Sequence, residues 1–541
     1  MVAAVQQGRA ASVTVQLLAI NDFHGNLEPP AGSNGLIGRT PAGGAEYLAT
    51  HLKNEIARNP NSIVVAAGDL IGASPLVSAL FHDEPAIESL NAMNMAVSSV
   101  GNHEFDRGRD ELRRMQTGGC HPADGCQDGD GFAGARFQYL SANVVDQAGS
   151  TSATLFPATA VRTIAGVKIG FIGETLRNTP QIVTPAGVGG LTFLDEATTA
   201  NKYAAELKQQ GVRVIVLLIH QGGEQSTGTD PNGCVGFGGA IARIAERLSP
   251  DIKVAISGHT HEFYNCTIFG HSVTSASSFG RMITRVNVTI NRSDGTITSV
   301  SATNGIVGRH VAKDPSQTRI IARYASVSAP IANRIVGSVR ADIRRAPNRA
   351  GESALGDVIA DAQLVATSRA DKGGAVVAFT NPGGIRADLI ASNRVGSEEP
   401  GQVTYSELFT IQPFTNIMTV LTLTGDTIKR LLEQQFGGVA AGTNRILQVS
   451  SGFTYSYKRD APRGQHVTPG SIKIGGRIIA PNDRVRVATN NFLATGGDGF
   501  TAFQAGTDQL GGDVDIDALV EYFKAHSPVA PGAQNRIVRV D

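Results

Sequence analysis

Short apolar runs that lead into polar, glycine-containing loops recur through the first half of this 541-residue chain. The runs have the length and composition of buried β-strands, and stretches with helical patterns separate them. They occupy residues 13–20, 62–67, 97–100, 167–173, 212–219 and 253–257. All but the fourth lead at once into a loop that contains Asp, Asn or His. Because ligands bind beyond the carboxyl ends of the strands in α/β sheets, these loops are predicted to converge on one site.

The chain is too long for one ordinary hydrophobic core, so two domains are expected. A helix is predicted at residues 314–336, where apolar residues recur at helical spacing after an Asp-Pro pair, and it is taken as the linker. The first domain is then residues 12–313 and the second residues 337–541. In the second domain the expected elements are a helix at 354–366, strands at 375–380 and 484–489, and a strand–helix unit at 417–436.

Composition excludes several classes of protein. Hydrophobic residues make up 41% and charged residues 17% of the chain, as in folded soluble proteins. The formal net charge is zero, which argues against binding to a nucleic acid polymer or an anionic membrane. No run of 18 apolar residues is present, so no membrane span is expected, and no signal peptide is recognisable at the start of the sequence.

The four cysteines fall into two local groups outside the strand-end loops. Cys120 and Cys126 lie in a Gly- and Asp-rich stretch at residues 118–135, and Cys234 and Cys266 lie further on. The even count favours two disulfides, Cys120–Cys126 and Cys234–Cys266, in an oxidising compartment. The alternative is four reduced thiols in a cytosolic protein.

The strand-end loops contain residues of the types that bind metals. Singly, each is more often a turn residue, a helix cap or a hydrogen-bonded structural side chain. Together they form a set of carboxylates, imidazoles and an amide: Asp22, His24, Asp69, Asn102, His103, Asp106, His220, His259 and His261. Two divalent ions held by such a set activate water and neutralise charge on a phosphoryl group. The set therefore predicts a dinuclear phosphoesterase.

The blocks DFHG, GD, GNHEFD, H and GHTH, in this order, resemble the signature of the calcineurin-like metallophosphoesterases. The second half resembles the C-terminal domain of the 5′-nucleotidase family, of the bacterial 5′-nucleotidase/UDP-sugar hydrolase type. The resemblance implies an α/β (α+β) fold. It would consist of a four-layer α/β/β/α metallophosphoesterase sandwich, a linker helix and a C-terminal α/β substrate-binding domain.

The resemblance also assigns roles to the residues of the first domain. It implies that the first metal is bound by Asp22, His24 and His261, that the second is bound by Asn102, His220 and His259, and that Asp69 bridges the two. His103 is similar to the family's histidine that stabilises the phosphoryl group in the transition state, and Asp106 to the carboxylate that orients it. The ions are expected to be Zn²⁺, Mn²⁺, Co²⁺ or Fe²⁺, among which these ligands do not decide.

The second domain has residues suited to a nucleotide, which presents a flat base, a ribose diol and a phosphate. Aromatic rings stack on bases, a carboxylate accepts from ribose hydroxyls, and arginines bind phosphate. The resemblance implies that substrate is bound by Arg349, Asn381, Gly384, Arg386, Phe414, Asn416, Phe492 and Asp498. The alternative for either phenylalanine is packing in a hydrophobic core.

The expected function is hydrolysis of nucleotides, chiefly nucleoside 5′-monophosphates to nucleoside and phosphate, with nucleoside di- or triphosphates or UDP-sugars as further substrates. A 2′,3′-cyclic nucleotide phosphodiesterase with 3′-nucleotidase activity would use the same metal-binding half and ranks second. A thiosulfate-ester hydrolase of sulfur oxidation shares the scaffold and ranks third, because the base-stacking pair is present here. An alternative of another class is an inactive nucleotide-binding surface protein, against which the complete ligand set argues. The chain is expected to be a periplasmic or secreted monomer or dimer.

Overall fold

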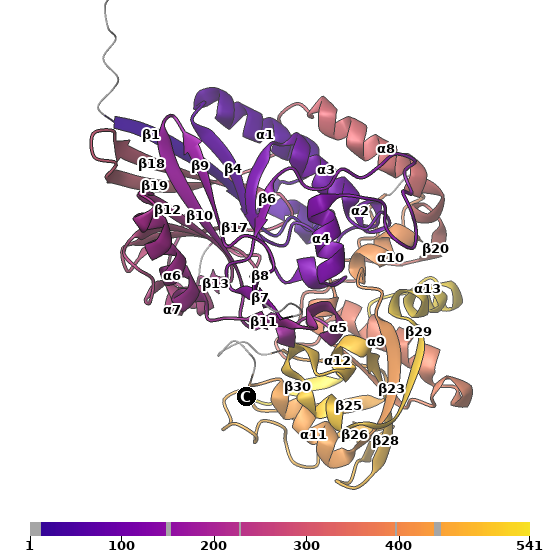
Figure 1. Cartoon of the computed structure of the whole chain (residues 1–541). Helices are drawn as coiled ribbons and strands as arrows, with labels where there is room; N and C mark the ends of the chain where they lie inside the picture. Colours follow the sequence, from indigo (N-terminus) through magenta and orange to yellow (C-terminus); the bar gives the residue numbers. More distant parts are fainter. Residues whose placement is uncertain (1–11, 148–152, 227–228, 395–397, 438–444) are drawn as a thin grey trace, which may run out of the picture.

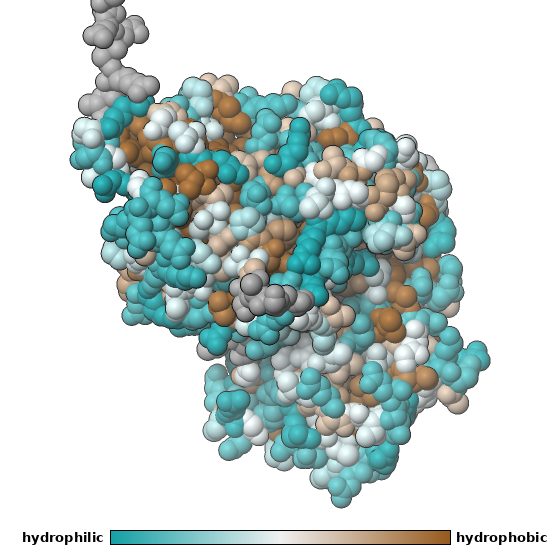
Figure 2. Space-filling view, viewed as in Figure 1, coloured by the Kyte–Doolittle hydropathy of each residue, from teal (hydrophilic) through white to brown (hydrophobic). Residues whose placement is uncertain are grey.

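The computed structural model describes residues 12–147, 153–226, 229–394, 398–437 and 445–541. The start of the chain, where no signal peptide was recognised, lies outside the described residues. Two domains are visible in Figure 1, with the N-terminal one above and the C-terminal one below. On the face seen in Figure 2 the surface is mostly hydrophilic, with hydrophobic atoms in small separate patches.

The first domain contains two six-stranded sheets that pack face to face. The order in the first sheet is β19 (Ile297–Ile306), β18 (Met282–Asn291), β1 (Ser12–Ile20), β4 (Ser62–Ala67), β5 (Met95–Ser99) and β6 (Gln138–Leu140). The order in the second is β16 (Phe263–Ile268), β17 (His271–Ala276), β15 (Ile252–Ser257), β12 (Val214–His220), β10 (Val167–Thr175) and β9 (Thr159–Ile164). All six predicted strands are present, with bounds shifted by at most two residues.

Helices cover the outer faces of both sheets, which completes the four layers (Figure 1). One side carries α1 (Ala45–Arg58), α3 (Glu84–Ala92) and α4 (Arg109–Thr117), and the other α6 (Glu196–Gln209) and α7 (Ala240–Ala245). Strand β1 shows why the run is continuously apolar: Leu17 packs between the sheets while Leu18 packs under the helices. A strand buried on both faces needs apolar side chains at both alternating positions.

Strand direction brings the polar loops together. Strands β1, β4, β5 and β6 are parallel to one another, as are β10, β12, β15 and β17. Their carboxyl ends therefore meet at one edge of the two packed sheets, next to the second domain.

The second domain is also of mixed α/β type. Its larger sheet has the order β24 (Gln448–Val449), β21 (Val377–Thr380), β28 (Arg484–Asn490), β23 (Ile417–Thr424) and β29 (Thr507–Val514). A smaller sheet has the order β27 (Arg477–Ile478), β26 (Lys473–Ile474), β25 (Phe453–Tyr457) and β30 (Ile537–Arg539). The helices are α9 (Ala354–Thr367), α10 (Tyr405–Ile411), α11 (Gly425–Gln434), α12 (Asn491–Ala494) and α13 (Asp515–His526).

Helix α8 (Pro315–Ala332) connects the domains and packs along the first of them, beside α1 and α3 (Figure 1). Its N-cap is Asp314, whose side chain accepts hydrogen bonds from Ser316 N at 3.0 Å and Gln317 N at 3.4 Å. Tyr324 is fully buried, with its ring 4.8 Å from that of Phe81. The connector is therefore anchored to the first domain by apolar packing.

The two domains touch beside the strand-end loops. Leu76, in the short helix α2 (Leu76–Ala79) of the first domain, is buried in a hydrophobic cluster of the second. Asn34 donates from Nδ2 to the Arg386 carbonyl oxygen at 2.9 Å, and its Oδ1 accepts from Arg345 Nη2 at 2.9 Å. These contacts hold the second domain against the edge where the loops converge.

Both predicted disulfides are confirmed, Cys120–Cys126 and Cys234–Cys266. The alternative of four reduced thiols is therefore wrong. No helix in the described ranges combines the length and the apolar character needed to cross a membrane.

Candidate metal centre and adjoining cleft

The seven predicted metal ligands follow the carboxyl ends of β1, β4, β5, β12 and β15 and lie together. Five of them adopt the left-handed backbone conformation, with φ between 49° and 74°: Asp22, His24, Asp69, His259 and His261. This conformation is uncommon for residues other than glycine, and it clusters at functional sites. The loops turn sharply here to direct their side chains at one point.

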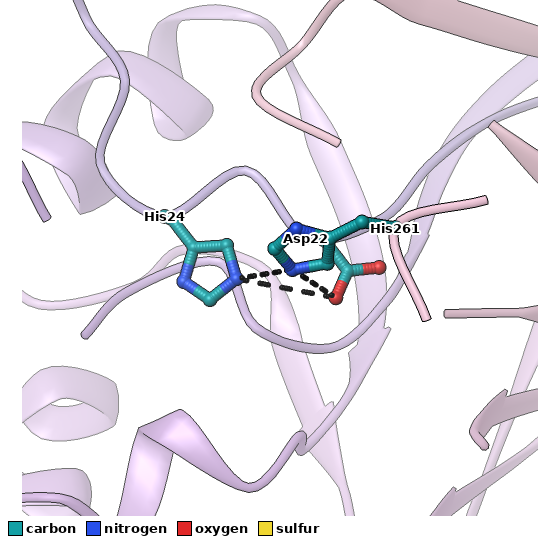
Figure 3. A group of neighbouring side chains, drawn as sticks. All are labelled: Asp22, His24 and His261. Carbon is teal, nitrogen blue, oxygen red and sulfur yellow. Dashed lines mark hydrogen bonds and ion pairs between the residues drawn. The ribbon is translucent and has the colours of Figure 1, made fainter. Parts of the chain in front are cut away.

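The first predicted ligand group is compact. The side chains of His24, His261 and Asp22 point toward one another (Figure 3). His24 Nε2 lies 3.1 Å from His261 Nε2, and His261 Nε2 lies 3.4 Å from Asp22 Oδ1. These three side chains can each offer one ligand atom to the same ion.

The second predicted group surrounds Asp69. His220 Nε2 lies 3.0 Å from Asp69 Oδ2, and His24 Nε2 lies 3.7 Å from the same oxygen. His259 Nδ1 lies 3.0 Å from Asn102 Oδ1. Asp69 thus lies between residues of the two groups, as a bridging carboxylate must.

Neighbouring carbonyl groups orient two of the imidazoles. His24 Nδ1 lies 2.8 Å from the Gly72 carbonyl oxygen, and His220 Nδ1 lies 2.7 Å from that of Ala67. Donation from Nδ1 leaves Nε2 directed at Asp69, which is the usual arrangement around metal-binding histidines.

The charge state of the imidazoles fits divalent metal binding. Burial lowers the pKa of His24, of His261 and of His259, the last to about 3, so these imidazoles are neutral as metal ligands must be. His220 differs, because the carboxylate of Asp69 outweighs burial and raises its pKa to about 10. A divalent cation would take the place of that proton. The donor set of nitrogen and carboxylate oxygen suits Zn²⁺, Mn²⁺, Co²⁺ or Fe²⁺.

Glu104 supports the centre from behind, a role that the sequence analysis did not assign. Its buried carboxylate accepts three backbone hydrogen bonds, from Asp69 N at 2.9 Å, Leu70 N at 2.7 Å and Gly101 N at 2.6 Å. Burial and the Asp69 carboxylate raise its pKa to about 8, while the backbone donors act in the opposite direction. Glu104 therefore holds the backbone of the ligand loops after β4 and β5 together.

His103 and Asp106 form a pair beside the ligands. His103 Nδ1 lies 2.7 Å from Asp106 Oδ2, and the His103 ring stacks on that of Phe414 with centroids 5.6 Å apart. Burial lowers the pKa of His103, but Asp106 and Asp69 together raise it above its ordinary value. Asp106 thus favours the protonated form of the imidazole next to the ligands.

A cavity of about 330 Å³ extends from these residues into the second domain. Both domains line it, with Asn102, His103, Asp106 and His259 on one side. On the other side are Asn381, Gly384, Arg386, Phe414, Asn416, Arg445, Phe492 and Asp498. Seven of the eight predicted substrate-binding residues are therefore brought to one cleft.

Asp498 has a defined position in this cleft. Its carboxylate accepts from Asn381 Nδ2 at 2.9 Å and from Arg445 Nη1 at 2.5 Å. Its backbone is left-handed, with φ of 57°. Arg386 lies closer to the ligands, with its guanidinium 5.7 Å from the centre of the Phe414 ring.

Comparisons with known proteins agree with this arrangement. A calcineurin-like phosphoesterase model matches residues 15–263, and a 5′-nucleotidase C-terminal domain model matches residues 330–505. The cell wall protein Lmo0130 of Listeria monocytogenes is 33% identical over 96% of this chain and 68% of its own length. The chain belongs to the 5′-nucleotidase family.

Two further relatives show the extent of the likeness within the 5′-nucleotidase family. The crystal structure of a 5′-nucleotidase precursor from Thermus thermophilus superimposes with a TM-score of 0.78 at 26% identity, over 98% of this chain and 100% of the other. Endonuclease YhcR of Bacillus subtilis is 31% identical over 97% of this chain. The chain spans 41% of the length of YhcR.

One predicted substrate residue of this 5′-nucleotidase family member lies elsewhere. Arg349 is not among the described residues that line the cleft, and its Nη2 donates to the Asp541 backbone oxygen at 2.6 Å. The Asn-Arg-Ala-Gly turn that contains it faces the C-terminal strand region rather than the first domain. Arg445 lines the cleft instead, and no motif in the sequence had pointed to it.

Proposed function

We propose that this chain hydrolyses nucleoside 5′-monophosphates to nucleoside and phosphate with two divalent metal ions. The observation that carries the proposal is the single cleft that joins the metal ligands to two aromatic rings and a carboxylate of the second domain. A nucleotide has the same order of parts, with its phosphate at one end and its base at the other. Asp22, His24 and His261 would hold one ion, Asn102, His220 and His259 the other, and Asp69 both.

The ions would supply Lewis-acid charge and activate the attacking water. Around them, the side chains of this chain bind and orient the substrate. In its protonated form His103 would donate from Nε2 to a phosphoryl oxygen, while its Nδ1–H donates to Asp106 and orients the ring. Arg386 would bind the same oxygens, since it lines the cleft together with Asn102, His103 and His259.

The base and ribose would occupy the second-domain half of the cleft. Phe414 and Phe492 both line it, and a base stacked on such rings gains roughly 1–3 kcal/mol per ring contact. Asp498 would accept from the ribose hydroxyls, with Asn381 and Arg445 holding its carboxylate in place. Gly384 and Asn416 complete the lining.

The substrate range and the location are part of the same proposal. Nucleoside di- or triphosphates and UDP-sugars would be secondary substrates. Two disulfides favour an oxidising, extracytoplasmic compartment, and a relative bears the name of a cell wall protein.

A panel of substrates tests the proposal. Phosphate release is measured with AMP, ADP, ATP, UDP-glucose, 3′-AMP and 2′,3′-cyclic AMP, in the presence of Mn²⁺ or Zn²⁺ and after a chelator. AMP is expected to be the best substrate, with activity lost on chelation. Preference for 3′-AMP and the cyclic nucleotide would replace the proposal by the phosphodiesterase alternative, and release from none of them with any metal would favour a binding protein.

Two variants separate ligand from catalyst. Asp69→Asn is expected to lose bound metal and nearly all activity, because the bridging carboxylate is removed. His103→Asn is expected to keep the metals but to lower kcat by about 10²–10⁴-fold, the usual range for general acid–base and electrostatic groups. His51→Asn is the matched control, since His51 binds only the Gly308 carbonyl oxygen among the hydrogen bonds found for it. Equal metal loss in both test variants would refute the division of roles.

A further inference from the structure

A second group of metal-binding side chains lies outside the centre described above. It consists of His82, Glu111, His121 and Asp124, which we call the loop cluster. His82 lies in the turn between α2 and α3, and Glu111 lies in the first turn of α4. His121 and Asp124 lie inside the loop closed by the Cys120–Cys126 disulfide. Three separate segments thus meet at one point.

The donor atoms of the loop cluster converge. One ligand atom each from His82, Glu111 and His121 lie within 4.8 Å of one another. His82 Nε2 lies 2.8 Å from Asp124 Oδ2, and His121 Nδ1 lies 3.4 Å from the same oxygen. The two imidazoles stack with centroids 3.7 Å apart and an angle of 10° between their planes. Both rings therefore direct a nitrogen toward the same carboxylate.

The backbone is shaped to place His82. Both His82 and Asp83 are left-handed, with φ of 54° and 64°. Asp83 holds this turn, because its carboxylate accepts from Gly72 N at 3.1 Å and Ser78 Oγ at 2.9 Å. Two successive left-handed residues other than glycine are costly, which indicates a functional constraint on the turn.

The charges within the loop cluster suit a cation. Burial and the neighbouring His121 lower the pKa of His82. The side chains of both histidines are largely buried, whereas that of Asp124 is 46% exposed. Glu111 is also bound by Arg114 at 2.9 and 2.7 Å, yet each carboxylate oxygen can accept more than one partner. Two imidazoles with carboxylates are a set that zinc binds tetrahedrally.

We propose that His82, Glu111, His121 and Asp124 bind a third divalent transition-metal ion of the zinc class, separate from the pair at Asp69. The ion ties the disulfide loop to the turn before α3 and to α4. His82 and Glu111 also line a cavity of about 220 Å³ whose wall includes His103 and Asp106. The role of the ion is structural, since it holds the wall beside the catalytic pair without touching the cleft.

The experiment measures bound zinc per chain by elemental analysis of the full chain after equilibration with Zn²⁺ and removal of free metal. His82→Asn, His121→Ala and Asp124→Ala are each expected to lose about one equivalent relative to the unmodified chain. Asn is chosen at position 82 because it tolerates positive φ. Asp124→Ala changes a half-exposed loop residue, so a loss of zinc in this variant is not expected to result from misfolding. His310→Asn, at an exposed histidine elsewhere in the first domain, is the control.

A second variant separates this site from the proposed catalytic pair. In Asp69→Asn the loop cluster is expected to retain its ion, and Co²⁺ added to this variant is expected to give the visible absorption of a tetrahedral site. His121→Ala in the same background is expected to abolish that absorption. Zinc content equal to the His310→Asn control in all three variants, or no His121-dependent cobalt signal, would overturn the proposal and leave the catalytic proposal standing.

Discussion

Replacing Glu104 by glutamine tests how far the metal centre depends on a residue that touches no metal. The carboxylate accepts three backbone N–H groups, two at Oε2 and one at Oε1. The glutamine oxygen can still accept from Asp69 N and Gly101 N, which now lie 2.9 and 2.6 Å from Oε2. Its NH₂ group then faces Leu70 N–H, which now donates to Oε1 at 2.7 Å. One buried donor is left without an acceptor, which costs about 1–3 kcal/mol.

The cost extends to metal binding, because all three donors belong to or adjoin predicted ligands, and Leu70 directly follows Asp69. Asp69 N belongs to the bridging residue, and Gly101 precedes Asn102. A Cβ at Gly101 would lie 2.2 Å from Asp69 Oδ1, so this backbone has little room to move. Loss of a supporting partner typically weakens metal affinity by about 10–100-fold. Competition with a chromophoric chelator measures the affinity, and urea unfolding of the metal-free protein measures the stability.

Glu433→Gln is the matched control for Glu104→Gln. The Glu433 carboxylate also accepts from two backbone groups, His466 N at 3.1 Å and Val467 N at 2.8 Å, but in the second domain. It is expected to lower stability by a similar amount and to leave metal affinity unchanged. Metal affinity and turnover of Glu104→Gln equal to those of this control would refute the reasoning.

Three other predictions concern the second domain and the connector. Burial raises the pKa of Asp515 from 3.8 to about 7, so the folded chain holds a proton that the unfolded chain loses. That contribution to the free energy of unfolding is complete below pH 3.8 and is lost as the pH rises through 7, by at most about 4 kcal/mol. Asp515→Asn should flatten this dependence of the free energy of unfolding on pH, measured by urea unfolding. Asp498→Asn should remove any preference for AMP over 2′-deoxy-AMP in kcat/KM; an unchanged ratio would contradict a ribose contact. Asp314→Ala should lower the free energy of unfolding by about 1 kcal/mol through loss of the α8 N-cap, and no change in the unfolding midpoint would count against it.

The fold of the first domain was predictable because its strands are buried on both faces. Residues 62–67 were predicted as a strand and form β4 with the same bounds. The ligands of such a sheet follow the strands directly in the sequence, so Asp69 and His220 could be found from short motifs. For these ligands, a position at the end of a strand in the sequence also means a position at one edge of the sheet.

The second-domain half of the cleft comes from several kinds of element: Asn381 directly follows β21, Phe492 lies in α12 and Asp498 lies in a turn. Arg349 and Arg445 are alike as side chains, and only the tertiary fold decides which of them faces the cleft. The role of Glu104 could not be predicted for another reason. In the sequence, a buried carboxylate that accepts from backbone N–H groups cannot be distinguished from one that binds metal. His82 and His121 share no motif, and their contact depends on how the disulfide loop lies against α4.

The order of the strands in the first sheet has a consequence for the nascent chain. Strand β1, which leads to Asp22, pairs with β18, and the last ligand is His261. At the usual rate of synthesis of about 5–20 residues per second, roughly 10–50 s pass between the two ligands leaving the ribosome's active site. Until then the early carboxylates and imidazoles have no partners from β15 and beyond. The complete predicted ligand set therefore exists only after synthesis has passed His261.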